Sequence, residues 1–282
     1  NELRLELQSA VQALSFAELL HSAQWAAELL AALPGSDAAA PAPLQLPISD
    51  ACKWGMLMLA KAHMGMREYS RAASVLGKDQ QSPAVFFRSY ALYLAGEKRK
   101  EEEIAEVQDP VEKGQVKNPE LKTLEEELSM LYQQRQLDGL GLYVYGITLK
   151  GLELKEDARR VLLESVQAFP CNWSAWLDII SISSDLNDVN ECRTDLILPN
   201  HWMSNFFEAA FQLELQRNES AKNVYAMLRG TFPESSYVTS QLATCFYNMR
   251  NFDSSQAAFE EMRKRDPYRL TSLDTYSNIL FV

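Results

Sequence analysis

The feature that most restricts the fold of this chain is a period of 34 residues, marked by a proline near the end of each repeat. Pro233 and Pro267 are 34 residues apart, and Pro170 marks an earlier repeat. Counting each proline as position 32 gives windows that start at residues 139, 202 and 236. Positions 8 and 20 then hold small residues, in pairs: Gly146 and Ala158, Ala209 and Ala221, Ala243 and Ser255. This spacing is typical of a repeated helix–turn–helix unit.

The small residues explain how one unit packs. Positions 8 and 20 are where the two antiparallel helices approach most closely, so a side chain larger than a methyl group would push them apart. Gly146 costs about 1 kcal/mol of helix propensity relative to alanine, which close packing can offset. The proline ends the second helix because it disfavours the α region for the preceding residue. Since one unit cannot cover its own apolar face, we predict an all-α, right-handed tetratricopeptide solenoid.

Other segments fit the period less well. Ala60 and Ala72 are twelve residues apart and predict a unit at about 53–82. Ala91 marks a further first helix, and Trp176 opens a unit whose second helix is degenerate. We therefore expect about seven helix pairs followed by an orphan helix.

The chain as a whole, residues 1–282, is expected to be a single solenoid and the N-terminal part of a longer protein. The sequence opens without methionine. At its end, Leu273, Tyr276 and Leu280 would lie on an orphan helix whose apolar face has no cover.

Two segments interrupt the period. Residues 34–49 are rich in proline and alanine and predict a flexible loop. Residues 96–138 are expected to be an insertion, in which Asn118-Pro119 predicts a helix start. One face of that helix carries Leu121, Leu124, Leu128 and Leu131. The insertion is either a solvated segment with this amphipathic helix packed on the solenoid, or a docking element for a partner.

Composition excludes several classes of function. The formal net charge of −11 disfavours nucleic-acid binding, because an acidic surface repels phosphates. No apolar run approaches the roughly 18 residues of a membrane span, and His21, His63 and His201 lack metal-ligand spacing. Four separated cysteines indicate buried free thiols in a reducing compartment, ahead of a metal or disulfide role. We expect no enzymatic activity, catalytic residue, cofactor or metal.

Positions 5 and 9 of the first helices line the concave groove of such a solenoid. Here they are three pairs: Tyr143 and Ile147, Phe206 and Ala210, Ser240 and Thr244. The lysine and asparagine that bind acidic chaperone tails in some tetratricopeptide proteins are therefore missing. The first two pairs are apolar, which suits a helical or extended polypeptide, and a second copy of the chain is one such partner. The alternative is that Tyr143 and Phe206 pack against neighbouring repeats.

Four stretches carry a resemblance that the generic repeat does not require: LLHSAQWAAELL at 19–30, EKGQVKNPEL at 112–121, LDGLGLYVYGITL at 137–149 and RKRDPYRLTSLDTYSNILFV at 263–282. In these stretches the chain closely resembles the N-terminal half of the cell-division-cycle-twenty-three family, tetratricopeptide subunits of the anaphase-promoting complex. That complex is a ubiquitin ligase. The resemblance covers nearly the whole chain and is weak at 31–50 and 181–200.

The resemblance implies a non-catalytic scaffold in cell-cycle-regulated ubiquitination, found in the nucleus and the cytoplasm. It implies homodimerisation through N-terminal repeats, with the first helices of one copy in the groove of the other. Leu7, Val11 and Leu14 would then meet either the partner or their own second helix. Further implied partners are sibling tetratricopeptide subunits, small accessory subunits and a coactivator, the last mainly through later repeats. Two other functions remain as alternatives to the scaffold: a general tetratricopeptide adaptor of cochaperone or transport type, and an enzyme with a helical-repeat fold.

Overall fold

The structure is a computed structural model that describes residues 2–34, 51–77, 82–183 and 201–281. Every regular element in these ranges is an α-helix, and no strand occurs among them. The described residues form two compact units, which are treated separately below. This bears out the predicted all-α class.

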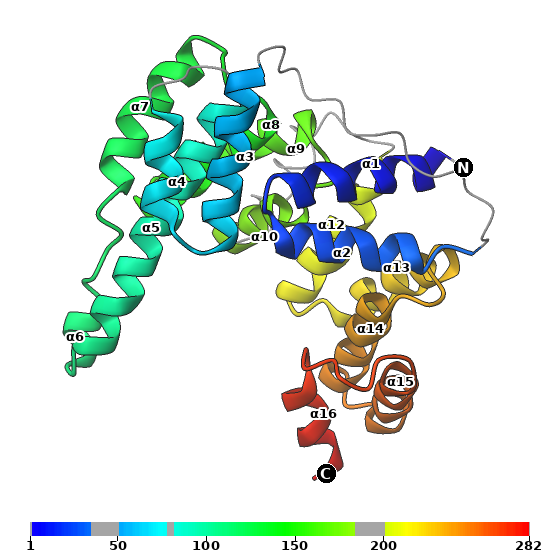
Figure 1. Ribbon diagram of the computed structural model, residues 1–282. Coiled ribbons are helices and arrows are strands. Elements are labelled where there is room, and N and C mark those ends of the chain that lie inside the picture. The colour runs from blue at the N-terminus through cyan, green and yellow to red at the C-terminus, as the bar shows by residue number, and fades with distance from the viewer. Residues whose placement is uncertain (1, 35–50, 78–81, 184–200, 282) are drawn as a thin grey trace. The chain divides into compact units, whose positions relative to one another are not determined.

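One unit, called unit 1, contains the first two helices and the last five described helices (Figure 1). Their bounds are α1 Glu2–Phe16, α2 Leu20–Ala31, α12 Met203–Glu214, α13 Asn218–Thr231, α14 Ser236–Asn248, α15 Phe252–Arg265 and α16 Leu273–Leu280. The other, unit 2, contains the helices between them. These are α3 Ala51–Gly65, α4 Tyr69–Leu76, α5 Ser82–Glu106, α6 Pro110–Lys113, α7 Leu121–Gln133, α8 Gly139–Gly151, α9 Lys155–Ala168 and α10 Trp173–Ile182.

The three predicted windows are three antiparallel helix pairs: α8 with α9, α12 with α13, and α14 with α15. In the last pair the Ser255 hydroxyl at position 20 donates to the Ala243 carbonyl oxygen at position 8, at 2.7 Å. In the first pair a β-carbon added to Gly146 would lie 2.5 Å from Cδ2 of Leu162. The close approach is therefore real, but the side chain that Gly146 accommodates is Leu162 at position 24, not Ala158.

The turns that follow α1, α3, α7, α8, α12 and α14 each contain a residue with left-handed backbone, and none of these six residues is glycine. Their φ values lie between 55° and 66° at Glu18, Arg67, Arg135, Glu153, Gln216 and Arg250. The last three fall at position 15 of the predicted windows. A β-carbon makes this conformation costly, so the turn geometry of the repeat overrides the local preference of these residues.

The repeat prolines follow the second helices as expected. α9 ends at Ala168, two residues before Pro170, and Phe169 between them has left the helical region, with φ −142° and ψ 81°. Pro170 also helps to hold Trp176 in place, because the carbonyl oxygen of Pro170 accepts a 2.7 Å hydrogen bond from the Nε1–H of Trp176. Trp176 is completely buried at the start of the next unit. The predicted second helix of that unit, like the 34–49 loop apart from Pro34, lies outside the described residues.

The 96–138 segment differs from expectation at its first boundary. α5 continues without a break to Glu106, so residue 96 lies inside a helix. α7 begins at Leu121 rather than at Asn118, and its four leucines are buried. Asn118 instead joins the segment to α5, because its amide nitrogen donates to the Tyr93 carbonyl oxygen at 3.0 Å. Gly96 permits this contact, since a β-carbon there would overlap the Asn118 amide.

The last helix also differs from expectation. α16 is not bare, because Tyr276 and Ile279 are buried with Phe259 and Met262 of α15. The rings of Phe259 and Tyr276 lie 5.6 Å apart. Leu280 remains 57% exposed, as predicted for an apolar residue without a cover. Only part of the apolar face of α16 is therefore open in the described residues.

Candidate functional site

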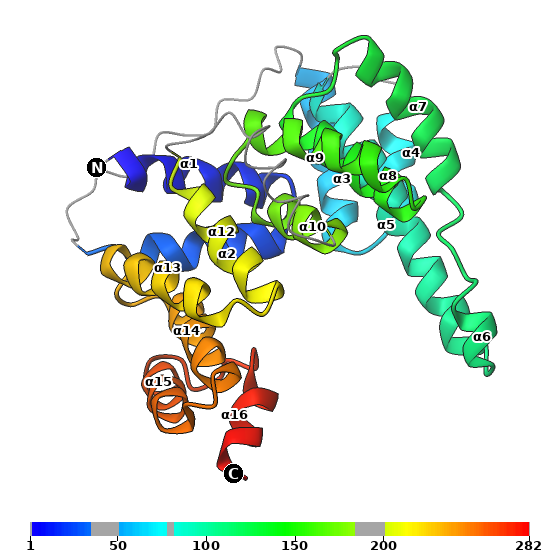
Figure 2. The same cartoon turned by 180° about the vertical axis from the view of Figure 1, so that it is seen from behind.

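The side chain that organises unit 1 is Trp25 of α2. It stacks on Trp202, next to α12, with ring centroids 6.4 Å apart and planes 8° apart. It meets Phe206 of α12 edge to face at 5.0 Å, and Tyr237 of α14 at 6.0 Å. Figure 2 shows α2 running beside these helices. We call the surface formed by Trp202, Phe206, Ser235 and Tyr237 the α12–α14 face. Within unit 1, helix α2 packs on this face through Trp25.

A carboxylate at the same contact joins α2 to the start of α14. Oε1 of Glu28 accepts a hydrogen bond from the backbone N–H of Tyr237 and lies 3.4 Å from the Ser235 hydroxyl. Oε2 of Glu28 accepts a 2.9 Å bond from Arg269, in the turn between α15 and α16. The first N–H groups of a helix lack partners within it and carry partial positive charge, so a carboxylate is stabilised there. Glu28 is therefore held by a helix end and by a guanidinium.

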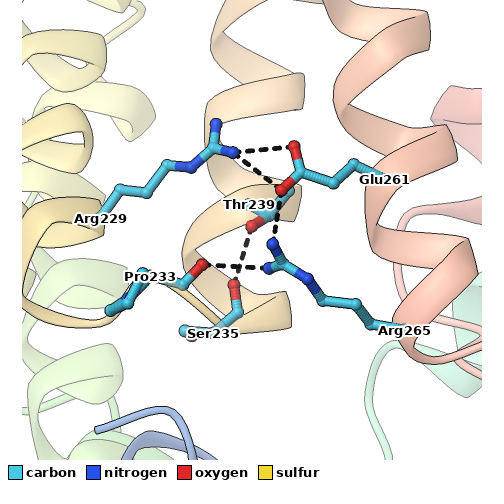
Figure 3. Close-up of polar contacts among 6 residues, drawn as sticks. All are labelled: Arg229, Pro233, Ser235, Thr239, Glu261 and Arg265. Carbon is cyan, nitrogen blue, oxygen red and sulfur yellow. Dashed lines mark hydrogen bonds and ion pairs between the residues drawn. The ribbon is translucent and has the colours of Figure 1, made fainter. Parts of the chain in front are cut away.

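The start of α14 is itself fixed by neighbouring helices (Figure 3). Glu261 of α15 accepts from Arg229 of α13 at 2.8 Å and from Arg265 at 2.6 Å. Arg265 also donates to the Pro233 carbonyl oxygen at 3.1 Å. Ser235 then caps α14, its hydroxyl accepting from the N–H of Val238. This network holds in place the start of α14, where Glu28 accepts from the N–H of Tyr237.

A second carboxylate, on α1, makes a similar contact. Oε1 of Glu6 lies 2.8 Å from Nε2 of His201, and Oε2 accepts a 2.9 Å bond from the indole N–H of Trp202. The α1–α2 pair thus carries one tryptophan and two carboxylates to a matching set of aromatic and donor groups. Aromatic rings and hydrogen-bond donors arranged in this way suit the binding of a polypeptide segment, which here is the α1–α2 pair of the same chain.

Comparison with known proteins agrees with the repeat geometry. The profile of the family described as "Anaphase promoting complex subunit 8 / Cdc23" matches residues 2–243. The chain belongs to this family.

Relatives in several kingdoms support the assignment. The "Cell division cycle protein 23 homolog" of Bos taurus is 42% identical over 94% of this chain and 44% of its own length. The "Anaphase-promoting complex subunit 8" of Arabidopsis thaliana is 40% identical over 87% of this chain and 41% of its own length. The chain therefore spans less than half the length of these two relatives. Among solved structures, a tetratricopeptide protein of Thermus thermophilus aligns over 82% of this chain and 100% of its own length, at 14% identity and with a TM-score of 0.36.

The predicted groove residues of this Cdc23-family chain lie in two different settings. In unit 1, Phe206 is fully buried beneath Trp25, and Ala210 is half-buried. On α1, Leu7 and Leu14 are fully buried within the unit and Val11 is half-buried. Phe206 therefore does meet a helix from a distant part of the sequence, and that helix belongs to the same chain.

In unit 2, Tyr143 and Ile147 are buried on α8. Burial, followed by the nearby Asp178 carboxylate, raises the pKa of the Tyr143 phenol well above its ordinary value. Burial also raises the pKa of Tyr90, on the neighbouring α5, to about 12. Asp178 itself pairs with Lys150 at 2.7 Å. These tyrosines are covered by helices of their own unit, which is what the alternative interpretation expected for Tyr143.

Sequence reasoning missed three residues that carry the site: Trp25, Glu28 and Arg269. All three lie inside the stretches that carried the family resemblance. Glu28 had a usable signal, because it is the one carboxylate in segment 19–33 and it is followed only by Leu and Ala. Arg269 had none, since it follows the repeat proline in a turn that the periodicity does not address.

The described residues show the histidines in ordinary roles. His63 is buried and its Nδ1 lies 2.7 Å from Glu68, a contact that lowers the pKa of that carboxyl. His201 contacts Glu6, and His21 is exposed. Within the described ranges, no three His, Cys, Asp or Glu side chains are grouped to hold a metal. None of the helices described is long and apolar enough to cross a bilayer.

Two of the four cysteines can be placed. Cys171 and Cys245 are free and buried, as predicted for these two. Burial raises the pKa of the Cys245 thiol to about 12, which suppresses the reactive thiolate. The side chains of Cys52 and Cys192 lie outside the described residues.

Proposed function

We propose that this chain is a structural, non-catalytic part of an anaphase-promoting complex subunit, and that it provides surfaces for homodimerisation and for docking other subunits. The observation that carries the proposal is family membership over residues 2–243. The helix-receiving α12–α14 face supports it, because a scaffold needs surfaces that bind helices. Relatives named as subunit 8 of that complex occur in Arabidopsis thaliana and Dictyostelium discoideum.

Unit 2 has a surface suited to docking a further subunit. On α3 the exposed side chains include Trp54, Met56 and Leu59, and Met66 is exposed in the turn that follows. Gly55 lies on the same open side of the helix, with no atom within 4 Å of an added β-carbon. Exposed apolar side chains gathered on one helix mark an interaction surface. We assign it to another subunit of the complex.

Affinity purification tests the proposal. The chain, carrying a tag, is expressed in cells of its source, and the proteins that co-purify are identified by mass spectrometry. We expect other subunits of the ubiquitin ligase. Recovery of chaperones through their acidic tails, with no ligase subunit, would instead establish a general tetratricopeptide adaptor.

Self-association is tested separately by measuring the mass of the purified chain at several concentrations. One copy has a mass of 31.9 kDa, and we expect twice that value at the higher concentrations. A fluorescent fusion tests the proposed location in the nucleus and the cytoplasm. Fluorescence confined to any other compartment contradicts it.

A further inference from the structure

Helix α3 of unit 2 has a covered side and an open side. Leu57, Ala60 and Met64 recur at spacings of three and four residues and are buried, where α3 packs against α4 and α5. Trp54 and Leu59, by contrast, are each about half exposed. Large apolar side chains left in water on one side of a helix mark an interaction surface. We call this surface the open side of α3.

The open side has two small residues along its middle. Gly55 and Ala62 are both exposed and are seven residues apart, which is about two helical turns. At the angles of an α-helix, Trp54 and Met58 lie on one side of this line and Leu59 lies on the other. Small residues between larger ones form a groove into which the ridge of a second helix can pack closely. The shape therefore suits a helix that lies along α3.

Gly55 shows that this close approach is not used inside the described part of the chain. No described atom lies within 4 Å of a β-carbon added at Gly55. Gly146, by contrast, accommodates Leu162 of its own unit. Glycine inside a helix is less favourable than alanine, and nothing described in the chain offsets that cost at Gly55. A partner that approaches the helix backbone at this point would offset it.

The charges on and beside α3 have one sign. Residues 51–67 include Lys53, Lys61 and Arg67 but no Asp or Glu, although the net charge of the chain is −11. Charges farther apart than roughly 8 Å are screened at physiological salt, so local charges act most strongly on a bound segment. Lys61 is paired with Glu18, whereas Arg67 is exposed just beyond the end of α3. The open side therefore favours a segment that carries carboxylates.

The same charges disfavour a second copy of α3 as the occupant. Two α3 helices packed face to face would bring their lysines together, with no carboxylate on either helix. Like charges brought together across an interface act against the wrong partner.

We propose that the open side of α3 binds an amphipathic helix of another subunit, with its apolar ridge along Gly55 and Ala62 and its carboxylates beside Arg67. The proposal rests on the docking role in the proposed function. It adds to that role the kind of partner that this surface takes.

Photo-crosslinking identifies the occupant. A photoreactive phenylalanine analogue replaces Leu59 in the tagged chain, which is expressed in cells of its source and irradiated, and the joined peptides are sequenced by mass spectrometry. We expect a segment of a different ligase subunit, apolar at helical spacing and carrying Asp or Glu. The same analogue in place of Met130, which is exposed on α7, controls for contacts that any exposed apolar position makes.

Two model peptides test the chemistry that is recognised. Each is about three heptads long with leucines on one face, and the flanking positions are Glu in one peptide and Lys in the other. In fluorescence anisotropy at low salt, the Glu peptide should bind the purified chain about tenfold more tightly than the Lys peptide. Arg67→Glu should weaken binding of the Glu peptide about threefold and strengthen binding of the Lys peptide. This variant should fold, because Glu18 and Glu153 occupy the same left-handed turn position after α1 and α8.

Gly55→Ala separates binding from stability. Its methyl group would enter the close approach, so it should weaken binding of the Glu peptide about tenfold while the melting temperature of the chain rises. Gly230→Ala is the matched control, since Gly230 is an exposed glycine of α13 with no described atom within 4 Å of an added β-carbon. It should leave peptide binding unchanged.

The outcomes distinguish the inference from the proposed function. If the analogue at Leu59 crosslinks to a second copy, to a segment without carboxylates or to nothing, while ligase subunits still co-purify, the inference is wrong and docking stands. Equal affinities for the two peptides, or unchanged binding by Gly55→Ala, also overturn the inference. If the parent chain recovers no ligase subunit, the proposed docking role fails and the inference fails with it.

Discussion

Phe206 in unit 1 and Tyr143 in unit 2 occupy position 5 of their repeats, yet they are buried by different means. Phe206 lies beneath Trp25, 181 positions earlier in the sequence (206 − 25). Tyr143 is buried beside Tyr90 and Asp178 of helices in its own unit. The repeat position thus determines which face of a helix a residue occupies. It does not determine what covers that face, because the cover can come from any segment that the chain brings there.

The largest expected effect comes from removing the ring of Phe206, which Trp25 of the distant helix α2 covers. Phe206→Ala should lower the free energy of unfolding by about 3–5 kcal/mol, since a large buried side chain is removed. In a double-mutant cycle with Trp25→Ala, the two rings should show a coupling of about 0.5–1.5 kcal/mol. Denaturant unfolding monitored by circular dichroism gives both values.

Tyr143→Ala is the matched control for that cycle. It should cost about as much by itself, but its effect should add to that of Trp25→Ala within about 0.5 kcal/mol, because the two side chains are covered independently. A coupling as large as that of Phe206 would show that the two settings are not distinct.

A smaller effect tests the close helix approach in unit 2. Gly146→Ala should destabilise by about 1–2 kcal/mol, because its new methyl group would overlap Leu162 and the crowding outweighs the gain in helix propensity. Gly55→Ala, on the open side of α3, should instead stabilise by up to about 1 kcal/mol. Thermal unfolding of the two variants checks the opposite signs. A stabilised Gly146→Ala would mean that Leu162 moves aside without cost.

Both units should lose stability in alkali, through their buried tyrosines. Burial raises the pKa of Tyr90 in unit 2 to about 12 and also raises that of Tyr225 in unit 1. An unfolded tyrosine ionises near pH 10. The stability that these groups contribute is therefore complete below about pH 10 and falls as the pH rises toward the folded pKa values. Unfolding measured between pH 9 and pH 11.5 should show the loss.

Tyr90→Phe isolates one such group. The variant should lose less stability than the parent over that pH range, by at most about 1.4 kcal/mol per pH unit above pH 10. Identical pH profiles for the variant and the parent would contradict a raised pKa at Tyr90.

The smallest effect should be the same in two repeats of unit 1. Gln216 and Arg250 are exposed and have left-handed backbone at position 15. Glycine adopts this conformation without a steric penalty, so Gln216→Gly and Arg250→Gly should each stabilise by about 0.5–1 kcal/mol. Melting temperatures of the single variants test this. A loss of stability in either would mean that the replaced side chain makes contacts that offset the strain.

The periodic sequence by itself determined the helix pairs, the ends of the second helices and the small residues at their closest approach. These follow from local rules, because a proline limits its predecessor and a small residue at a fixed spacing lets two adjacent helices touch. The pattern could place Gly146 in the contact but could not name Leu162 as the side chain it accommodates. It also put a break at residue 96, because the charged run in the second half of α5 resembles a loop although it continues the helix.

Tertiary structure alone decided what covers the apolar faces. No local pattern relates Glu28 to Arg269, which are 241 residues apart, or Trp25 to Phe206. Likewise, Tyr276 was expected to be bare and is covered by Phe259, because the turn after Pro267 brings α16 back to α15. Contacts of this kind depend on where the chain returns in space, and a repeat gives each helix a face but leaves the choice of partner to the folded structure.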